Sequence, residues 1–155
     1  IFHKILLKLP ILGKIMQKVN LARFSRTLSS LLKTDIQIIK SFQITASVVG
    51  NLSYRTALLQ TADVLKEGVS ITESLKKSPN LFPPLVTQMI SVGEKSGTTD
   101  QLLGELAEFY EAEVDEVTKS LSSIIEPIII VFLGVVVGGM AIAVISPIYS
   151  LSDQM

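Results

Sequence analysis

A long uncharged segment near the C-terminus constrains this chain more than any other feature. Ile128 to Ser146 form a run of nineteen residues without a charged side chain. At a rise of about 1.5 Å per residue, a helix of this length crosses a hydrocarbon core of about 30 Å, and uncharged runs of about 18 residues or more are candidate transmembrane helices. The sequence therefore predicts a membrane protein with a transmembrane helix over residues 124–147.

The distribution of charge predicts how the chain is oriented. All fourteen basic residues precede the uncharged run, and only Asp153 is charged after it. Because cytoplasmic loops are enriched in Lys and Arg, we expect residues 13–123 in the cytoplasm and the tail 148–155 outside it. A C-terminus outside the cytoplasm, periplasmic or extracytoplasmic, fits this arrangement.

The net charge of zero conceals a separation of charge along the chain. Residues 1–60 contain nine basic residues and one acidic residue, whereas residues 61–127 contain five and twelve. The basic opening fits either membrane lipids, through an anionic surface, or the solvated face of an ordinary helix. It lacks the interleaved aromatic residues of a nucleic-acid site, so we expect no nucleic-acid partner.

The first residues predict that this chain belongs to a longer protein. It opens with apolar side chains beside a basic anchor at Lys4. We expect residues 1–12 to be a membrane-proximal basic segment that follows an upstream span. No cysteine is present, which excludes disulfide bonds and thiolate chemistry in these residues.

The periodicity of residues 13–123 is helical almost throughout, with apolar residues three and four apart. Gly50 and Asn51 are expected to end the second helix, and Gly68 the third. Ser70 and Glu73 fit a capping box at a helix start. The prediction is an all-α fold, a six-helix cytoplasmic bundle followed by a C-terminal transmembrane helix, with these expected helical ranges: 13–32, 36–49, 52–66, a short helix after 70, 84–95 and 99–123.

The residues of known catalytic or metal sites are missing from this sequence. His3 is the only histidine, and it lies in the membrane-proximal segment at the start of the chain, so a Ser-His-Asp triad has no plausible base. The acidic residues of 105–116 lack the Glu-x-x-His repeats of di-iron bundles. We therefore predict no enzyme activity, no cofactor and no metal, and we interpret the acidic residues as a solvated face or, alternatively, as a surface for a basic partner.

Two short motifs are candidate structural or partner-binding sites. In the turn over residues 93–97, Gly93 and Gly97 suit a helix end, and Gly97 can adopt a positive φ. Glu94 can order this turn or bind a cation through its oxygens. Glu126 and Pro127 can kink the helix at the membrane interface, or Glu126 can find a partner in a neighbouring span or subunit.

A set of short motifs is spread along the chain: Ala22-Arg23-Phe24, Phe82-Pro83, Met89-Ile90, Gly93-Glu94-Lys95-Ser96-Gly97, Phe109-Tyr110, Glu113-Val114-Asp115 and Glu126-Pro127-Ile128. With these motifs the sequence resembles the family called general secretion pathway protein F, the inner-membrane platform proteins of type II secretion systems and type IV pilus assembly. The resemblance covers nearly the whole chain. One departure is Thr34-Asp35-Ile36, where the family has a Ser-Gly-Val turn; Asp tolerates the left-handed conformation.

This resemblance implies the second of two cytoplasmic helical domains and the third of three spans. It implies a scaffold that couples a cytoplasmic hexameric assembly ATPase to polymerisation of pilin or pseudopilin subunits, beside other inner-membrane assembly proteins. Whether the machine secretes proteins, builds a pilus or takes up DNA is not separated by the resemblance. A transporter or channel subunit with Glu126 in its permeation path is the alternative.

Four further residues are candidates for contacts. Arg23 and Arg26 can meet an acidic surface of the ATPase or the acidic face of the bundle itself. Gly134 and Gly138 form a small-residue motif that lets two helices approach closely, which is consistent with a homo-oligomer.

Overall fold

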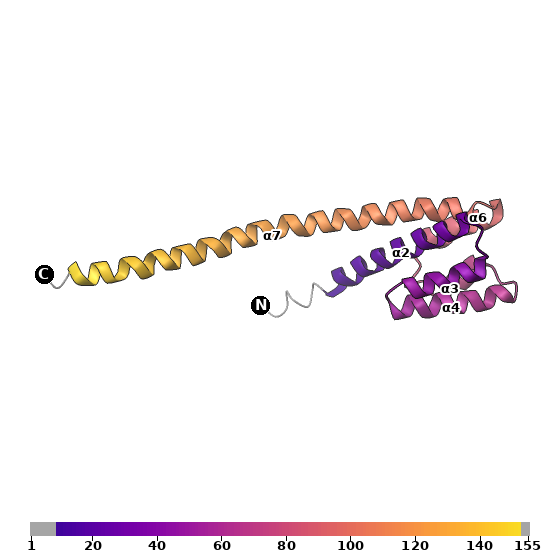
Figure 1. Ribbon diagram of the computed structural model, residues 1–155, viewed down its shortest axis with the longest axis horizontal. Helices are drawn as coiled ribbons and strands as arrows, with labels where there is room; N and C mark the ends of the chain where they lie inside the picture. Colours follow the sequence, from indigo (N-terminus) through magenta and orange to yellow (C-terminus); the bar gives the residue numbers. More distant parts are fainter. Residues whose placement is uncertain (1–8, 153–155) are drawn as a thin grey trace. The chain divides into compact units, whose positions relative to one another are not determined.

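The computed structural model describes the secondary structure of residues 9–152 and the side chains of residues 13–145. Residues 1–8 and 153–155, which include most of the predicted membrane-proximal segment and the end of the predicted tail, lie outside the described residues. The described part is all-α, as predicted, and has these six helices (Figure 1): α2 Leu9–Lys33, α3 Ile38–Val48, α4 Leu52–Lys66, α5 Ile71–Leu75, α6 Pro84–Ser96 and α7 Thr99–Ser152.

The turn between α2 and α3 depends on Asp35. This residue has φ 57°, in the left-handed region that Asp enters more easily than most side chains. The backbone amides of Thr34 and Asp35 donate to the carbonyls of Leu31 and Leu32. The expectation that Asp can replace the usual glycine in this turn is confirmed.

Helices α3 and α4 form an antiparallel pair (Figure 1), and their connection differs from the prediction. Gly50 is not among the residues with positive φ, and Val49, the residue after α3, has an extended backbone. Asn51 caps the next helix instead, because its Oδ1 accepts hydrogen bonds from the amides of Ser53 and Tyr54. The prediction that Gly50 and Asn51 end α3 in the left-handed conformation is therefore wrong; Asn is also a preferred N-cap residue.

The next boundaries follow the predicted signals more closely. Helix α4 has the predicted bounds and is followed by Gly68 at φ 86°. Pro84 is the first residue of α6, where its missing amide proton costs nothing. Ser70 accepts a hydrogen bond from the Glu73 amide, so one half of the predicted capping box is confirmed.

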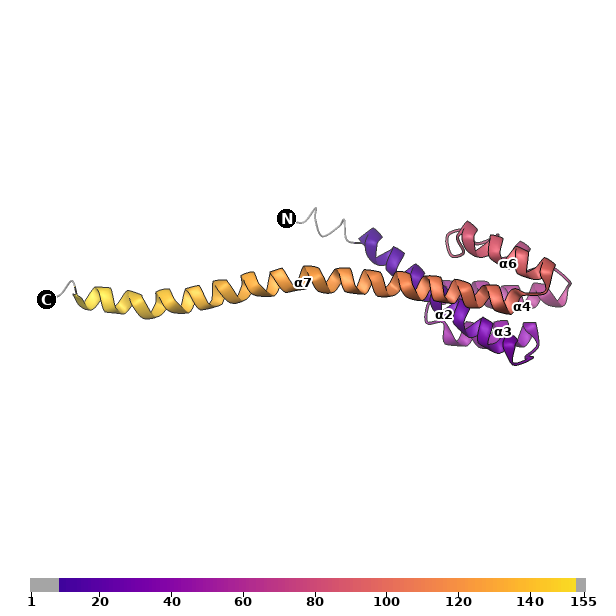
Figure 2. The same ribbon diagram turned by 90° about the horizontal axis from the view of Figure 1, so that it is seen from above.

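The chain divides into two compact units, with the boundary between Asp115 and Glu116. The first unit has one hydrophobic core, to which α2 to α6 and the first turns of α7 contribute. Its centre is aromatic, since the Phe82 ring lies 5.4 Å from the rings of both Phe24 and Tyr54 in edge-to-face arrangements. Figure 2 shows α6 apart from the α3–α4 pair, and α5 contacts both α4 and α6.

The second unit is the remainder of α7, and it is apolar. The segment has a window of mean hydropathy 3.0 and is long enough to cross a membrane, judged by length and composition. Its large aliphatic side chains are exposed, with Ile142 at 71%. Helix α7 is continuous through Pro127. The sixth predicted helix and the candidate span are therefore one element.

Candidate functional site

The first candidate site is the edge along which α2 meets the beginning of α7. Arg26 donates two hydrogen bonds to Glu111, from Nε to Oε1 at 2.8 Å and from Nη2 to Oε2 at 2.7 Å. Lys18 pairs with Glu113 at 2.6 Å. Two ion pairs therefore bridge the α2–α7 edge. The partners are 85 residues apart in sequence in the Arg26–Glu111 pair and 95 residues apart in the Lys18–Glu113 pair.

The electrostatics of the Arg26–Glu111 pair follow from this geometry. The hydrogen bond to Glu111 raises the pKa of Arg26, and the same bond lowers the pKa of the Glu111 carboxyl. Both side chains are nearly half exposed, and solvent-exposed pairs contribute about 0–1 kcal/mol. The pair therefore adds little stability, and it bridges α2 and α7 at a register that the packing of their shared core fixes.

Arg23 lies beside this edge but is not neutralised in the same way. Among residues 13–145, no ion pair joins Arg23 to a carboxylate. It lines a cleft of about 290 Å³ with Arg26, Glu111 and Asp115. Of the two arginines singled out from the sequence, Arg26 binds the bundle's own acidic face, and Arg23 keeps an exposed charge.

The second candidate site is the end of α6, where Gly93 lies in the last turn of the helix and Gly97 follows it, and the two glycines have different roles. Gly97 has φ 73°, a conformation that L side chains rarely adopt. A Cβ built on Gly93 would come within 2.7 Å of the Thr99 Cα. Gly93 therefore lets α6 approach the start of α7, and Gly97 lets the chain reverse between them.

The side chain of Glu94 reaches from the last turn of α6 to the beginning of α5. Its Oε1 accepts from the Ile71 amide at 2.6 Å, and its Oε2 accepts from the Thr72 amide at 3.0 Å and from the Thr72 hydroxyl at 2.6 Å. Free amides at a helix start need acceptors, and a carboxylate is favoured there by the helix dipole. Because both oxygens already accept from protein groups, the geometry favours ordering of the turn over cation binding.

The Phe82-Pro83 motif lies at the junction of the aromatic core and α6. Phe82 is 1% exposed, and Pro83 is the residue before the first turn of α6. Next to Phe82, the Tyr54 hydroxyl donates to the Leu81 carbonyl at 2.7 Å. Burial raises the pKa of Tyr54, so this hydroxyl remains a donor at neutral pH.

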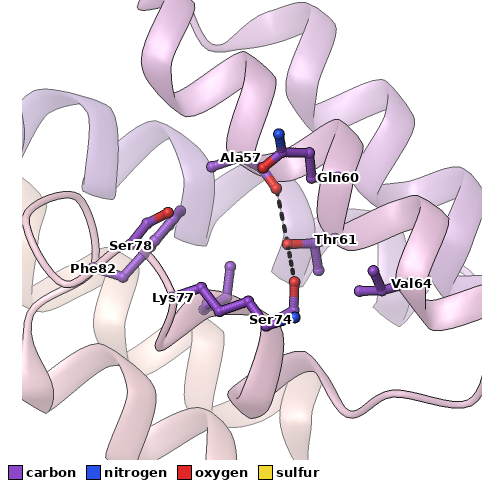
Figure 3. Close-up of a pocket in the computed structure, with 9 residues that line it drawn as sticks. Ala57, Gln60, Thr61, Val64, Ser74, Lys77, Ser78 and Phe82 are labelled. Atoms are coloured by element: carbon purple, nitrogen blue, oxygen red, sulfur yellow. Dashed lines mark hydrogen bonds between the residues drawn. The ribbon is translucent and has the colours of Figure 1, made fainter.

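Phe82 also lines a cavity of about 250 Å³ between α4 and α5 (Figure 3). Two of its polar side chains, Thr61 and Ser74, are paired with each other. Thr61 Oγ1 lies 2.9 Å from the Ala57 carbonyl and 2.8 Å from Ser74 Oγ (Figure 3). These two hydroxyls are therefore satisfied within the bundle, and we interpret the cavity as part of the packing of α5 on α4.

The remaining predicted residues lie on the apolar part of α7. Glu126 is exposed in the described structure, one residue before Pro127. A Cβ added at Gly134 or Gly138 would meet nothing within 4 Å. These two glycines leave flat positions on the helix surface, and the structure brings no described element against them.

Sequence reasoning missed the partners of Glu94, which lie 22 and 23 residues away. Local spacing placed Glu73 in a reciprocal cap, but no hydrogen bond from the Ser70 amide to the Glu73 carboxylate is found among the described residues. The sequence did contain a signal for this contact. Thr72 lies two residues after Ser70 at a helix start with free amides, and Glu94 belongs to a glycine-flanked motif.

Comparisons with known proteins place these features in a family. Residues 24–147 match the family described as type II secretion system (T2SS), protein F. A type IV pilus assembly protein, PilC, of Myxococcus xanthus is 39% identical over 154 residues, which cover 99% of this chain and 37% of that protein. TapC of Aeromonas hydrophila, also a type IV pilus assembly protein, is 39% identical over 97% of this chain and 36% of its own length.

A component of a type II secretion system is also similar to this chain. A type II secretion system protein F of Pseudomonas aeruginosa is 32% identical over 98% of this chain and 37% of that protein. The chain thus spans somewhat more than a third of the length of these curated relatives. The family match includes both the helical bundle and the apolar helix, and the chain belongs to the type II secretion system protein F family.

Proposed function

We propose that this chain is part of an inner-membrane platform protein of a type II secretion or type IV pilus machine. In this proposal the platform couples a cytoplasmic hexameric ATPase to polymerisation of pilin or pseudopilin subunits, without catalysis of its own. One observation carries it: the family match runs from the bundle into the apolar helix, over residues 24–147. The relatives named above are assembly or secretion components, which supports a structural role for this one.

The bundle would lie in the cytoplasm and the C-terminus on the other side of the membrane. The support for this orientation is the position of all fourteen basic residues before the apolar run. Residues 13–123 would form the second of two similar domains, residues 124–147 the span and residues 148–155 the tail.

The bundle also has properties that suit a mechanical adaptor. Two ion pairs and a buried core join α2 to the start of α7. Helix α7 belongs to both the bundle and the apolar segment. A displacement of the bundle would therefore be transmitted along one helix backbone, whose internal hydrogen bonds resist extension.

The test is photo-crosslinking of the full-length protein in intact cells. A benzophenone amino acid replaces Lys95 in one strain and Arg23 in another; both side chains are exposed, so neither change disturbs the core. Capture of a hexameric ATPase or a pilin-like subunit at Lys95 is the expected result, and it should disappear in cells from which that ATPase or pilin has been deleted. Capture of nothing but copies of itself at both positions would contradict coupling to a motor.

A further inference from the structure

The corner between α3 and α4 exposes aliphatic side chains at a tight turn. Val48 ends α3 with 49% of its surface exposed, and Leu52 begins α4 with 74% exposed. Single exposed aliphatic residues are normal on a protein surface. These two flank the same short connection, so they project from one corner of the bundle.

Two arginines lie at the same corner. The Arg23 Nη1 atom is 3.7 Å from the position that a Cβ would take on Gly50. Arg55 is one turn along α4 from Leu52, and its Nε donates to the Ala46 carbonyl in the last turn of α3 at 3.3 Å. Both arginines are exposed.

No carboxylate of the described residues forms an ion pair with Arg23 or Arg55. This distinguishes Arg23 from Lys18 and Arg26 on the same helix, which are paired with α7. The corner therefore presents two guanidinium groups without an ion pair among the described residues, beside two aliphatic side chains.

Residues of α2 lie at the same end of the bundle as the α3–α4 corner. Lys14 and Met16 line a cleft of about 370 Å³ together with Asn51, the residue between Gly50 and Leu52. Met16 is 53% exposed, and Lys14 adds a third cation to this end. Aliphatic tips surrounded by Lys and Arg are the pattern by which protein surfaces enter the headgroup region of anionic bilayers.

We propose that this α3–α4 corner contacts an anionic membrane surface, with Val48 and Leu52 in the headgroup region and Arg23 and Arg55 against lipid phosphates. The charge is complementary to such lipids, and the candidate span of α7 keeps the bundle tethered to a bilayer. Tethering makes the contact intramolecular, so weak affinity is sufficient. The inference depends on membrane insertion of α7 and not on a pilus or secretion role.

The test uses the full-length protein, with Leu52→Cys carrying an environment-sensitive fluorophore, reconstituted into vesicles. Residues 1–155 contain no cysteine, so within them the fluorophore attaches at position 52 alone. In vesicles of phosphatidylglycerol and phosphatidylcholine we expect a blue-shifted emission and quenching by brominated lipid. Arg23→Gln with Arg55→Gln should lower the equilibrium constant for lipid contact by about 25-fold, at about 1 kcal/mol or about fivefold per cation.

Two labelled positions serve as matched controls. Leu59 lies two turns further along α4 than Leu52 and is 42% exposed, and Val92 lies on α6 and is 58% exposed. A fluorophore on Leu59→Cys or on Val92→Cys should show weaker quenching than one at position 52. Equal quenching at positions 52 and 92, or none at position 52, would overturn the proposal. Burial that disappears when the protein is diluted with excess lipid would also overturn it, since a second copy would then be the occupant.

Discussion

Replacement of Glu94 should be the most damaging single change in the last turn of α6. Glu94 accepts three hydrogen bonds from Ile71 and Thr72, and these two residues are only 5% and 7% exposed. In Glu94→Ala their amides would lose their acceptor where water reaches poorly. An unsatisfied buried donor costs about 1–3 kcal/mol, so we expect a loss of about 3 kcal/mol in the free energy of unfolding. Glu94→Gln keeps one carbonyl acceptor and should lose about half of that.

Two neighbouring changes calibrate this value. Ser70→Ala removes one exposed cap hydrogen bond at 3.1 Å and should cost about 1 kcal/mol. Glu73→Ala should cost less than about 1 kcal/mol, because the remaining benefit of that carboxylate is its interaction with the helix dipole. The structure thus predicts that the loss in the free energy of unfolding decreases in the order Glu94→Ala, Glu94→Gln, Ser70→Ala, Glu73→Ala.

Urea denaturation of a soluble bundle fragment ending at Asp115 measures these free energies. Hydrogen exchange of the full-length protein locates the effect, because the amides of residues 71–75 should exchange faster in Glu94→Ala while those of α3 do not. A cost for Glu73→Ala equal to or larger than that for Glu94→Ala would show that the local capping box holds this helix and would refute the reasoning.

The remaining predictions concern the core, the α2–α7 edge and the apolar helix. Ser25 is fully buried and its Oγ has no partner among the described residues, so Ser25→Ala should raise the free energy of unfolding by about 1 kcal/mol in urea denaturation. A double-mutant cycle of Arg26→Ala and Glu111→Ala should give a coupling below about 1 kcal/mol; since the folded pKa of Glu111 is lowered, this coupling is present above the ordinary carboxyl pKa and is lost as pH falls through the lowered one. Gly138→Leu should weaken self-association in bilayers, measured by energy transfer between labelled copies, and unchanged association would exclude this face. Glu126→Gln should impair filament assembly or secretion without reducing protein level in the membrane; normal assembly would leave Glu126 as a helix residue only.

The sequence could predict the helices because their boundaries depend on neighbouring residues. Pro84, Gly68, Gly97 and Asp35 each act through their own φ or their own missing donor, so the pattern around them is sufficient. Asn51 shows the limit of this reasoning. Its side chain suits both a helix end and a helix start, and only the extended backbone at Val49 decides between them.

The partners of the charged residues could not be predicted from local pattern. The opposite charges of residues 1–60 and 105–116 indicated that α2 and α7 could attract each other, but not that Arg26 would pair with Glu111 and leave Arg23 exposed. That choice depends on the register of α2 on α7, which the packing of the core fixes. Arg26 and Glu111 are 85 residues apart in sequence. The same holds for Glu94, whose acceptor role exists only when α5 lies against α6.

The structure separates the two positions chosen for crosslinking. Arg23 lies at the corner where α4 begins, whereas Glu94 binds residues just after α4 ends, and the fifteen residues of α4 give a length of about 22 Å. If the corner contacts lipid, a benzophenone at position 23 should attach mainly to lipid, while one at Lys95, next to Glu94, remains available to a soluble partner. Capture of the ATPase at position 23 but not at position 95 would reverse this assignment and would place the motor contact, rather than the membrane contact, at the α3–α4 corner.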